Sequence, residues 1–333
     1  MFRNYLLTAW KVFLRRKLFT AINLLCIVLT LVVLMVVTAL LQNAFYPSGV
    51  EGKSERMLQM VMIRSHHTEQ KGAYTGLFGY KIIERYLKPM KGVEAVSAPH
   101  FPESVAVYQD GRVSDVQLRR TDAEYWRILD FRVVSGRVIN ADDVEQGRFV
   151  AVLNLSTARK LFPGRPYLNQ KFLVGGQTFT VIGVVEDALQ VNAYADAWVP
   201  ITTLPSTDYK RQELGNFTVM ILAHKAADLP AIKRDILRIA KTVRYDDPNI
   251  YNVAQFWGDS KLELFSRTLT NSTAEDAGAP KFVASIVALM LLFMALPALN
   301  LINLNVGRIM ERGSEIGVRK AFGATSRQLV AQL

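Results

Sequence analysis

Two long stretches without a charged residue limit what this chain of 333 residues can fold into. They cover residues 18–41 and 282–305, and each is longer than the roughly 20 residues that a helix needs to cross a bilayer. We therefore predict two transmembrane helices. A signal peptide is the alternative for the first stretch, but its apolar core is too long and residues 38–44 make a poor cleavage site.

Basic residues lie beside both stretches. Residues 1–17 contain basic side chains and no acidic one, and basic residues outnumber acidic ones after residue 305. By the positive-inside rule, both ends are expected in the cytoplasm and the segment between the spans outside it. The net charge of +11 is then mostly a topology signal, and no nucleic-acid partner is expected because the loop shows no basic patch. Residues 1–17 read as an amphipathic helix on the inner membrane surface, or else as a continuation of the span.

The segment between the spans repeats a strand–helix–strand pattern. Residues 58–63, 78–87 and 93–101 show it first, and residues 217–222, 229–243 and 251–256 show it again. We predict an extracytoplasmic domain over 47–256, with βαβ halves at 58–102 and 216–256 and a β-rich insert at 103–215. The insert contains a hairpin, 171–174 and 177–185, around Gly175-Gly176. The predicted fold class is membrane α plus α+β, with split ferredoxin-like halves. A helical stalk is expected over 257–281.

A dense charged block follows the second stretch. Glu311, Glu315 and Arg319 recur every four residues, in the order that favours helical ion pairs. We predict a short cytoplasmic helix over 307–323, ended by Gly323. A third span is expected to begin over 325–333.

Two segments carry a resemblance. The sequence Glu-Ile-Gly-Val-Arg-Lys-Ala-Phe-Gly-Ala-Thr over 315–325 resembles the signature of FtsX-like permease domains, and residues 149–164 and 177–186 are similar to the MacB periplasmic core. The chain thus resembles MacB/FtsX-type (type VII) ABC transporter permeases. In that family the cytoplasmic helix touches an ATPase, which implies coupling roles for Glu311, Arg312, Glu315, Ile316, Arg319, Lys320 and Phe322.

The resemblance also implies partners and a place in the cell. It implies a separate ATPase subunit, a second permease copy and a periplasmic adaptor, in a bacterial inner membrane with the large domain in the periplasm. It implies efflux or extraction of a substrate, driven by movement of that domain. Since the family has two further spans after the coupling turn, it implies a fragment or a truncated product. The substrate cannot be read from the sequence.

Catalytic and cofactor motifs are missing. No Gly-x-x-x-x-Gly-Lys-Ser/Thr phosphate loop occurs, so we expect ATP on a partner and no cofactor on this chain. His66, His67 and Glu69 read as solvated rather than as metal ligands, and Cys26 lies alone in the first span. We expect a non-catalytic subunit. Two alternatives stay open: a two-span sensor or scaffold, and an FtsX-like regulator of a cell-wall hydrolase.

Overall fold

The computed structural model describes residues 17–46, 49–109, 111–311, 313–323 and 325. It divides into two compact units, one of Met1–Ala44 with Pro280–Leu333 and one of Phe45–Ala279, which we call the core unit. The helix predicted over residues 1–17 and the third span predicted over 325–333 lie outside the described residues, apart from Lys17 and Thr325.

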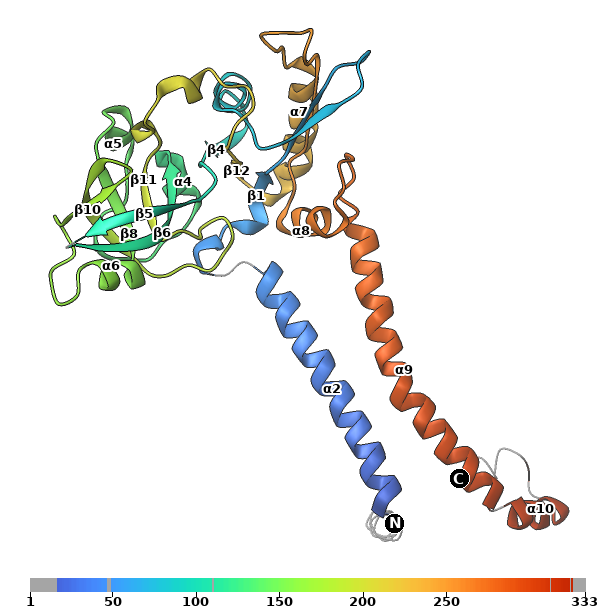
Figure 1. Ribbon diagram of the computed structural model, residues 1–333. Helices are drawn as coiled ribbons and strands as arrows, with labels where there is room; N and C mark the ends of the chain where they lie inside the picture. The colour runs from blue at the N-terminus through green and yellow to red at the C-terminus, as the bar shows by residue number, and fades with distance from the viewer. Residues whose placement is uncertain (1–16, 47–48, 110, 312, 324, 326–333) are drawn as a thin grey trace. The chain divides into compact units, whose positions relative to one another are not determined.

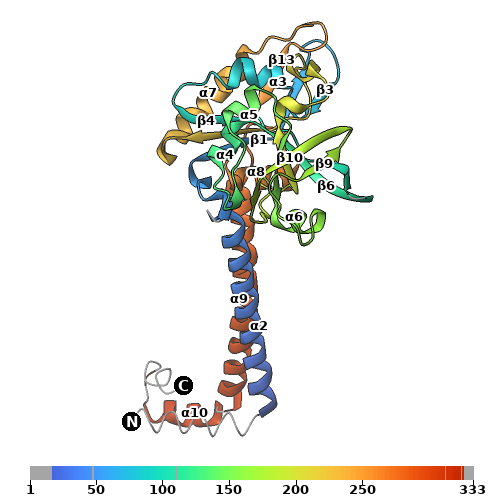
Figure 2. The same cartoon turned by 90° about the vertical axis from the view of Figure 1, so that its left-hand side faces the viewer.

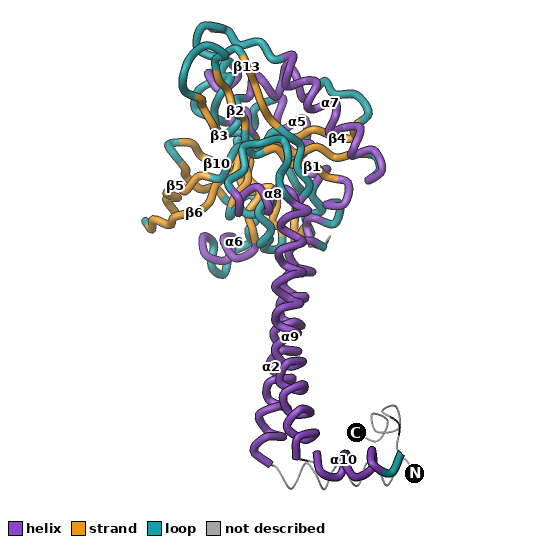
Figure 3. The backbone as a smooth tube through the Cα atoms, turned by 90° about the vertical axis from the view of Figure 1, so that its right-hand side faces the viewer, coloured by secondary structure: helices purple, strands orange, loops and turns teal. Residues whose placement is uncertain are grey.

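Both charge-free stretches form long helices. α2 covers Lys17–Phe45 and α9 covers Ala279–Glu311, and each runs without a break in the tube of Figure 3. Within them, Leu24–Gln42 and Ala279–Leu299 are long and apolar enough to cross a membrane. Large apolar side chains such as Leu25 and Leu292 are exposed along them. Such surfaces suit a hydrocarbon surrounding, where no water competes for the backbone hydrogen bonds of a helix.

The segment predicted as one coupling helix over 307–323 is described as helical on both sides of Arg312. α9 continues to Glu311, whereas α10 covers Gly313–Ala321 and is drawn as a separate helix in Figure 2. Arg312, between them, lies outside the described residues. That Glu311 and Glu315 share one helix therefore stays a prediction.

Two small antiparallel sheets are built from the first and last parts of the core unit. β12 (Val219–Ala223) lies between β1 (Met57–Met60) and β4 (Val93–Ser97), and β2 (Ile63–His66) lies between β13 (Val253–Phe256) and β3 (Ala73–Gly76). The strand predicted over 58–63 is interrupted at Val61 and Met62, where the chain passes from one sheet to the other. The strand predicted over 93–101 ends at Ser97.

Helices cover these sheets with apolar faces. α3 (Tyr80–Ile82) continues as the π-helical turn η3 (Ile83–Leu87), and α7 covers Leu229–Thr242 with Pro230 in its first turn. Ile83 and Ile236 are fully buried in one core with the strand residues, as the helical spacing of the apolar positions requires. The short 3-10 turns are η1 (Gly49–Glu51), η2 (Ser54–Arg56), η4 (Ile201–Thr203), η5 (Thr207–Lys210) and η6 (Ala226–Asp228).

The insert is a β-rich lobe whose strand pairings close into a ring. Around the ring lie β10 (Gln177–Val185), β8 (Val150–Asn154), β11 (Ala197–Pro200), β6 (Arg112–Thr121), β5 (Glu103–Gln109) and β9 (Lys171–Val174), and β9 pairs back onto β10 (Figure 1). β7 (Val133–Gly136) pairs with β10 outside the ring. The lobe's helices are α4 (Ala123–Ile128), α5 (Ala141–Glu145) and α6 (Leu155–Leu161). The predicted hairpin is present as β9 and β10.

A shared apolar cluster joins the lobe to the first sheet. Trp198 and Tyr125 of the lobe are fully buried together with Met57, Met220 and Leu222 of β1 and β12. Burial of this kind stabilises by roughly 25 cal/mol for each Å² of apolar surface removed from water. The lobe and the sheets therefore pack as one body, the core unit.

The segment predicted as a helical stalk over 257–281 is part of the core unit up to Ala279. α8 covers only Lys261–Thr270 and ends at Asn271, whose backbone has a left-handed φ of 49°. Asparagine is one of the few residues that adopt this conformation at small cost. The chain is then non-helical as far as Gly278, so within the predicted stalk only Lys261–Thr270 and the residues from Ala279 on are helical, and the interruption is longer than expected.

Asp143 makes the core unit's stability dependent on pH. Its side chain is fully buried, caps α5 together with Asn140, and accepts hydrogen bonds from Arg137 and Arg148. The hydrogen bond from Arg137 holds the pKa of Asp143 below its usual value. A carboxylate with a lowered pKa contributes stability above its unfolded pKa of about 3.9 and loses it as the pH falls through the folded pKa.

We therefore expect the free energy of unfolding to fall as the pH is lowered from about 5 toward about 2. Urea denaturation at a series of pH values, followed by tryptophan fluorescence on the detergent-solubilised chain, measures this. In Asp143→Asn the slope against pH should be smaller. An unchanged slope in this variant would assign the acid sensitivity to other groups.

Candidate functional site

The predicted coupling residues that the structure describes lie on or beside α10. Glu315 and Arg319 form an ion pair with 2.5 Å between Oε1 and Nη2, one helical turn apart as their spacing predicts. Lys320 is exposed, Ile316 is half-buried, and the Phe322 side chain is 88% exposed. The backbone of Glu311 belongs to α9, but the structure does not describe its side chain. Arg312 lies outside the described residues.

α10 ends as the sequence predicts. Gly323 has a left-handed φ of +90°, and its backbone N–H donates to the carbonyl of Lys320. An exposed pair such as Glu315–Arg319 adds only about 0.3–0.5 kcal/mol to helix stability. The ion pair therefore contributes little to helix stability, and it lies near the exposed ring of Phe322 in the sequence.

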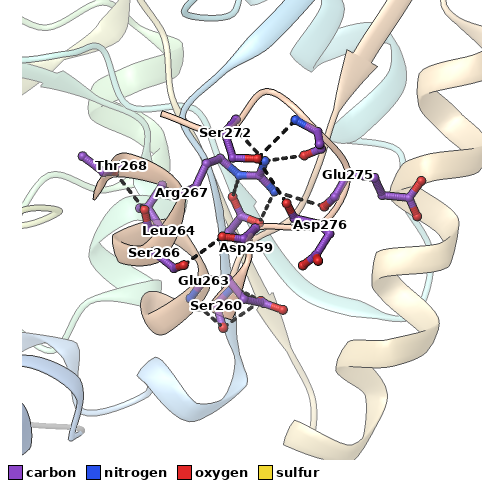
Figure 4. A network of polar contacts seen from close by, with 12 residues as sticks. Asp259, Ser260, Glu263, Leu264, Ser266, Arg267, Thr268, Ser272, Glu275 and Asp276 are labelled. Carbon is purple, nitrogen blue, oxygen red and sulfur yellow. Dashed lines mark hydrogen bonds and ion pairs between the residues drawn. The ribbon is translucent and has the colours of Figure 1, made fainter. Parts of the chain in front are cut away.

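A second candidate site was not predicted: a buried cluster around Arg267, which is 3% exposed (Figure 4). The guanidinium donates to both carboxylate oxygens of Asp259, at 2.6 Å from Nε and 3.0 Å from Nη2. Its remaining donors reach the backbone carbonyls of Ser272, Ala274 and Glu275. All five guanidinium N–H groups thus have an acceptor.

The cluster fixes the chain segment between α8 and α9. Three of the four carbonyls of residues 272–275 accept hydrogen bonds from this one cation, and Ser266 Oγ donates to the carbonyl of Ala277 at 2.8 Å. The ring of Trp257 lies 4.6 Å from the guanidinium carbon, a cation–π contact. The non-helical segment therefore has a defined path up to the first turn of α9.

Further contacts attach α8 to the rest of the core unit. Asp259 exchanges backbone hydrogen bonds with Gln59 of β1, at 2.8 and 2.9 Å. Glu263 forms a capping box with Ser260 and an ion pair with Lys233 of α7. Lys261 pairs with the buried Glu51 at 2.7 Å. The C-terminal part of the core unit is thus connected through α8 to β1, α7 and η1.

Burial and pairing have opposite effects on the carboxylates of this region. Burial raises the pKa of Asp259, and the hydrogen bond from Arg267 opposes that rise without cancelling it. Burial also acts to raise the pKa of Glu263, but the hydrogen bonds from Lys233 and Ser260 outweigh it and the pKa is lowered. The attraction between Asp259 and Arg267 therefore offsets the free energy that their removal from water costs.

The histidine pair shows no ligand geometry in the described residues. His67 Nδ1 accepts a hydrogen bond from the backbone N–H of Glu69 at 3.1 Å. Among the described residues, no three His, Cys, Asp or Glu side chains lie close enough together to hold a metal ion.

The sequence signal for the Arg267 cluster was weak, because an aspartate and an arginine eight positions apart do not reveal which backbone carbonyls the arginine will bind.

Breaking the buried pair should destabilise the core unit strongly. Arg267→Ala leaves the carboxylate of Asp259 buried without its partner, which costs about 3–5 kcal/mol. A matched control is Arg238→Ala, since Arg238 pairs with Asp235 at 3.1 Å on the exposed side of α7 and should cost under about 1 kcal/mol.

Urea denaturation of both variants, with intrinsic tryptophan fluorescence as the signal, compares the two losses. Losses of equal size would contradict the role given to Arg267.

Known proteins are similar to this chain in sequence. A family model described as MacB-like periplasmic core domain matches residues 20–239. The Macrolide export ATP-binding/permease protein MacB 1 of Yersinia pestis bv. Antiqua (strain Antiqua) is 25% identical over 348 residues, covering 99% of this chain and 49% of that protein. The chain therefore spans about half the length of this curated relative.

Solved structures extend the comparison to the fold. A domain of a protein described as a permease, from Porphyromonas gingivalis, matches with a TM-score of 0.50 and 14% identity, covering 64% of this chain and 92% of its own. The periplasmic region of MacB from Actinobacillus actinomycetemcomitans has a TM-score of 0.47 and 16% identity, covering 67% and 96%. At such identities, the first of these shows likeness of fold alone.

Proposed function

Since the chain belongs to the family of the MacB-like periplasmic core domain, we propose that it is a permease subunit of an ABC transporter whose ATPase is on a partner chain. The match confirms the predicted resemblance to MacB/FtsX-type permeases. The subunit would pass movement between the ATPase and the core unit, in efflux or extraction of a substrate from the periplasm or outer leaflet. The observation that carries the proposal is the extent of the match, which includes most of α2 and continues into α7.

The Arg267 cluster supports a mechanical role. A movement of α9 can displace the core unit only if the chain between them resists bending. Residues 271–278 have no helical hydrogen-bond ladder, but the guanidinium of Arg267 and the hydroxyl of Ser266 hold them by their carbonyls. The segment is thereby stiffened without being a helix, and this suits transmission of force.

Strand pairing supports a split ferredoxin-like core, with halves at 58–102 and 216–256 and the lobe at 103–215 inserted between them. If β1 and β2 are counted as one interrupted strand, the order is β13, β1/β2, β12, β4, and each neighbouring pair is antiparallel. Helices α3/η3 and α7 then occupy the two crossovers. This is the arrangement that two interleaved βαβ units produce.

The proposal places the chain in a bacterial inner membrane, with the N-terminus cytoplasmic and the core unit periplasmic. A reporter active only outside the cytoplasm should report when fused after Pro205, in the loop between η4 and η5, and stay silent when fused before Leu18. The basic flank before α2 is the physical reason. Equal signals from both fusions would remove the two-span topology and the function with it.

The coupling role of α10 predicts a selective loss. If its charges are desolvated against an ATPase, reversing one of them costs on the order of 2–5 kcal/mol of association. Glu315→Lys or Arg319→Glu should therefore abolish co-purification of the ATPase while membrane insertion and abundance stay unchanged.

Arg211→Glu is the matched control, because Arg211 forms a similarly exposed ion pair with Asp208, at 2.6 Å, in the core unit. It should leave the complex intact. ATPase binding that survives both α10 variants would count against coupling through this helix. Failure of any ATPase to accompany the wild-type chain would favour a regulator or sensor instead.

A further inference from the structure

A cavity of about 370 Å³ lies inside the core unit where three of its parts meet. The two sheets and the link between them contribute residues 59, 61–62, 75–77 and 218–220. The lobe contributes Arg119 with the segment 191–192, and the C-terminal part contributes Trp257, Asp259 and one face of α8. This volume is within the range of small-molecule sites, about 300–1,000 Å³. The cavity is therefore large enough for a small ligand.

The lining carries one positive charge that is not neutralised. Only Arg119, Asp259 and Arg267 among the lining residues are charged, and the last two form the buried pair already described. Arg119 is 5% exposed, and no carboxylate of the described residues lies within ion-pair distance of it. Glu51, which accepts a hydrogen bond from the side chain of Asn192, is paired with Lys261.

The contacts of Arg119 leave donors free for an anion. Its Nη1 and Nη2 donate to the carbonyls of Asn192 and Val191, at 2.8 and 3.2 Å, and its guanidinium lies 6.0 Å from the ring centre of Tyr125. Nε has no hydrogen-bond partner among the described residues, but it is fully buried, as is the unpartnered Nε of Arg120, so an anion would bind the second N–H groups of Nη1 and Nη2. A guanidinium carries five N–H donors, so these neutral contacts do not exhaust it. Burial lowers the pKa of Arg119, because it disfavours the charged form.

The neighbouring arginine shows the ordinary alternative. Arg120 is buried to the same 5% but has an ion pair with Glu103. Two adjacent arginines of β6 thus differ in one respect: Arg120 meets a carboxylate of its own chain, whereas Arg119 faces a cavity. A buried cation without a counter-charge is costly, and an anion in the cavity would relieve that cost.

We propose that this cavity binds a small amphiphilic anion, with its acidic group at Arg119 and its hydrocarbon body against the apolar lining. That lining includes Val61, Leu77, Phe101, Met220, Trp257 and Leu264. A site of this composition selects for one negative charge on an apolar body, since the apolar wall excludes strongly hydrated ions. The inference stands apart from the transport role, because it rests on the cavity and on Arg119 alone.

Octanoate and its neutral counterpart octanamide are matched probes. Saturation-transfer NMR on the full chain in nanodiscs, with empty nanodiscs as the blank, measures their affinities. We expect saturable binding of octanoate and at least tenfold weaker binding of octanamide, since only the carboxylate can pair with the guanidinium. Arg119→Gln should remove this preference, and Arg119→Lys, which keeps the charge, should retain part of it.

A second variant tests the cavity without touching the arginine. Thr268 lines the cavity but is exposed on α8, so Thr268→Trp should fold and reduce octanoate binding at least tenfold by filling the space. Leu269→Trp is the control, because Leu269 is exposed on the same helix and does not line the cavity. Equal affinity for the two probes in the wild-type chain, or octanoate binding that survives Thr268→Trp, would overturn the proposal.

Discussion

The buried ion pair between Asp259 and Arg267 is the contact on which the C-terminal part of the core unit depends. Two charges removed from water are stable only when their remaining hydrogen-bonding capacity is met. Arg267 meets that requirement by collecting the carbonyls of Ser272, Ala274 and Glu275. The path of residues 272–275 is thus set by hydrogen bonds to one side chain rather than by helix propensity. Loss of the pair would remove these bonds.

Charged groups inside the core unit fall into two kinds. Arg120 and Arg267 each meet a carboxylate of the chain itself, so their charges are neutralised within the fold. Arg119 has only neutral contacts and lies at a cavity. Buried charges with a structural role are usually paired within the fold, whereas an unpaired buried charge beside a cavity is a candidate ligand contact.

Sequence patterns predicted the features that local chemistry determines. Charge-free length indicated α2 and α9, Gly175-Gly176 indicated the hairpin of β9 and β10, and the spacing of Glu315 and Arg319 indicated their ion pair. Features that depend on distant partners escaped prediction. The ring closes through pairing of β9 with β5 as well as β10, and the Arg267 cluster unites residues whose types alone look like a solvated helix and loop. The docking role of α10 stays a prediction, since it depends on a second chain.

The strand β6 has a consequence for how the lobe could be exchanged between relatives. Leu118 pairs with Glu103 on one side and with Ala197 on the other, so the chain enters and leaves the lobe on strands that flank the same residue. Two strand spacings amount to about 10 Å, a gap that a very short linker can bridge. The strands of the lobe therefore join the parent fold at two neighbouring points, and a replacement of residues 103–200 would have to cover Met57, Met220 and Leu222, which the lobe buries.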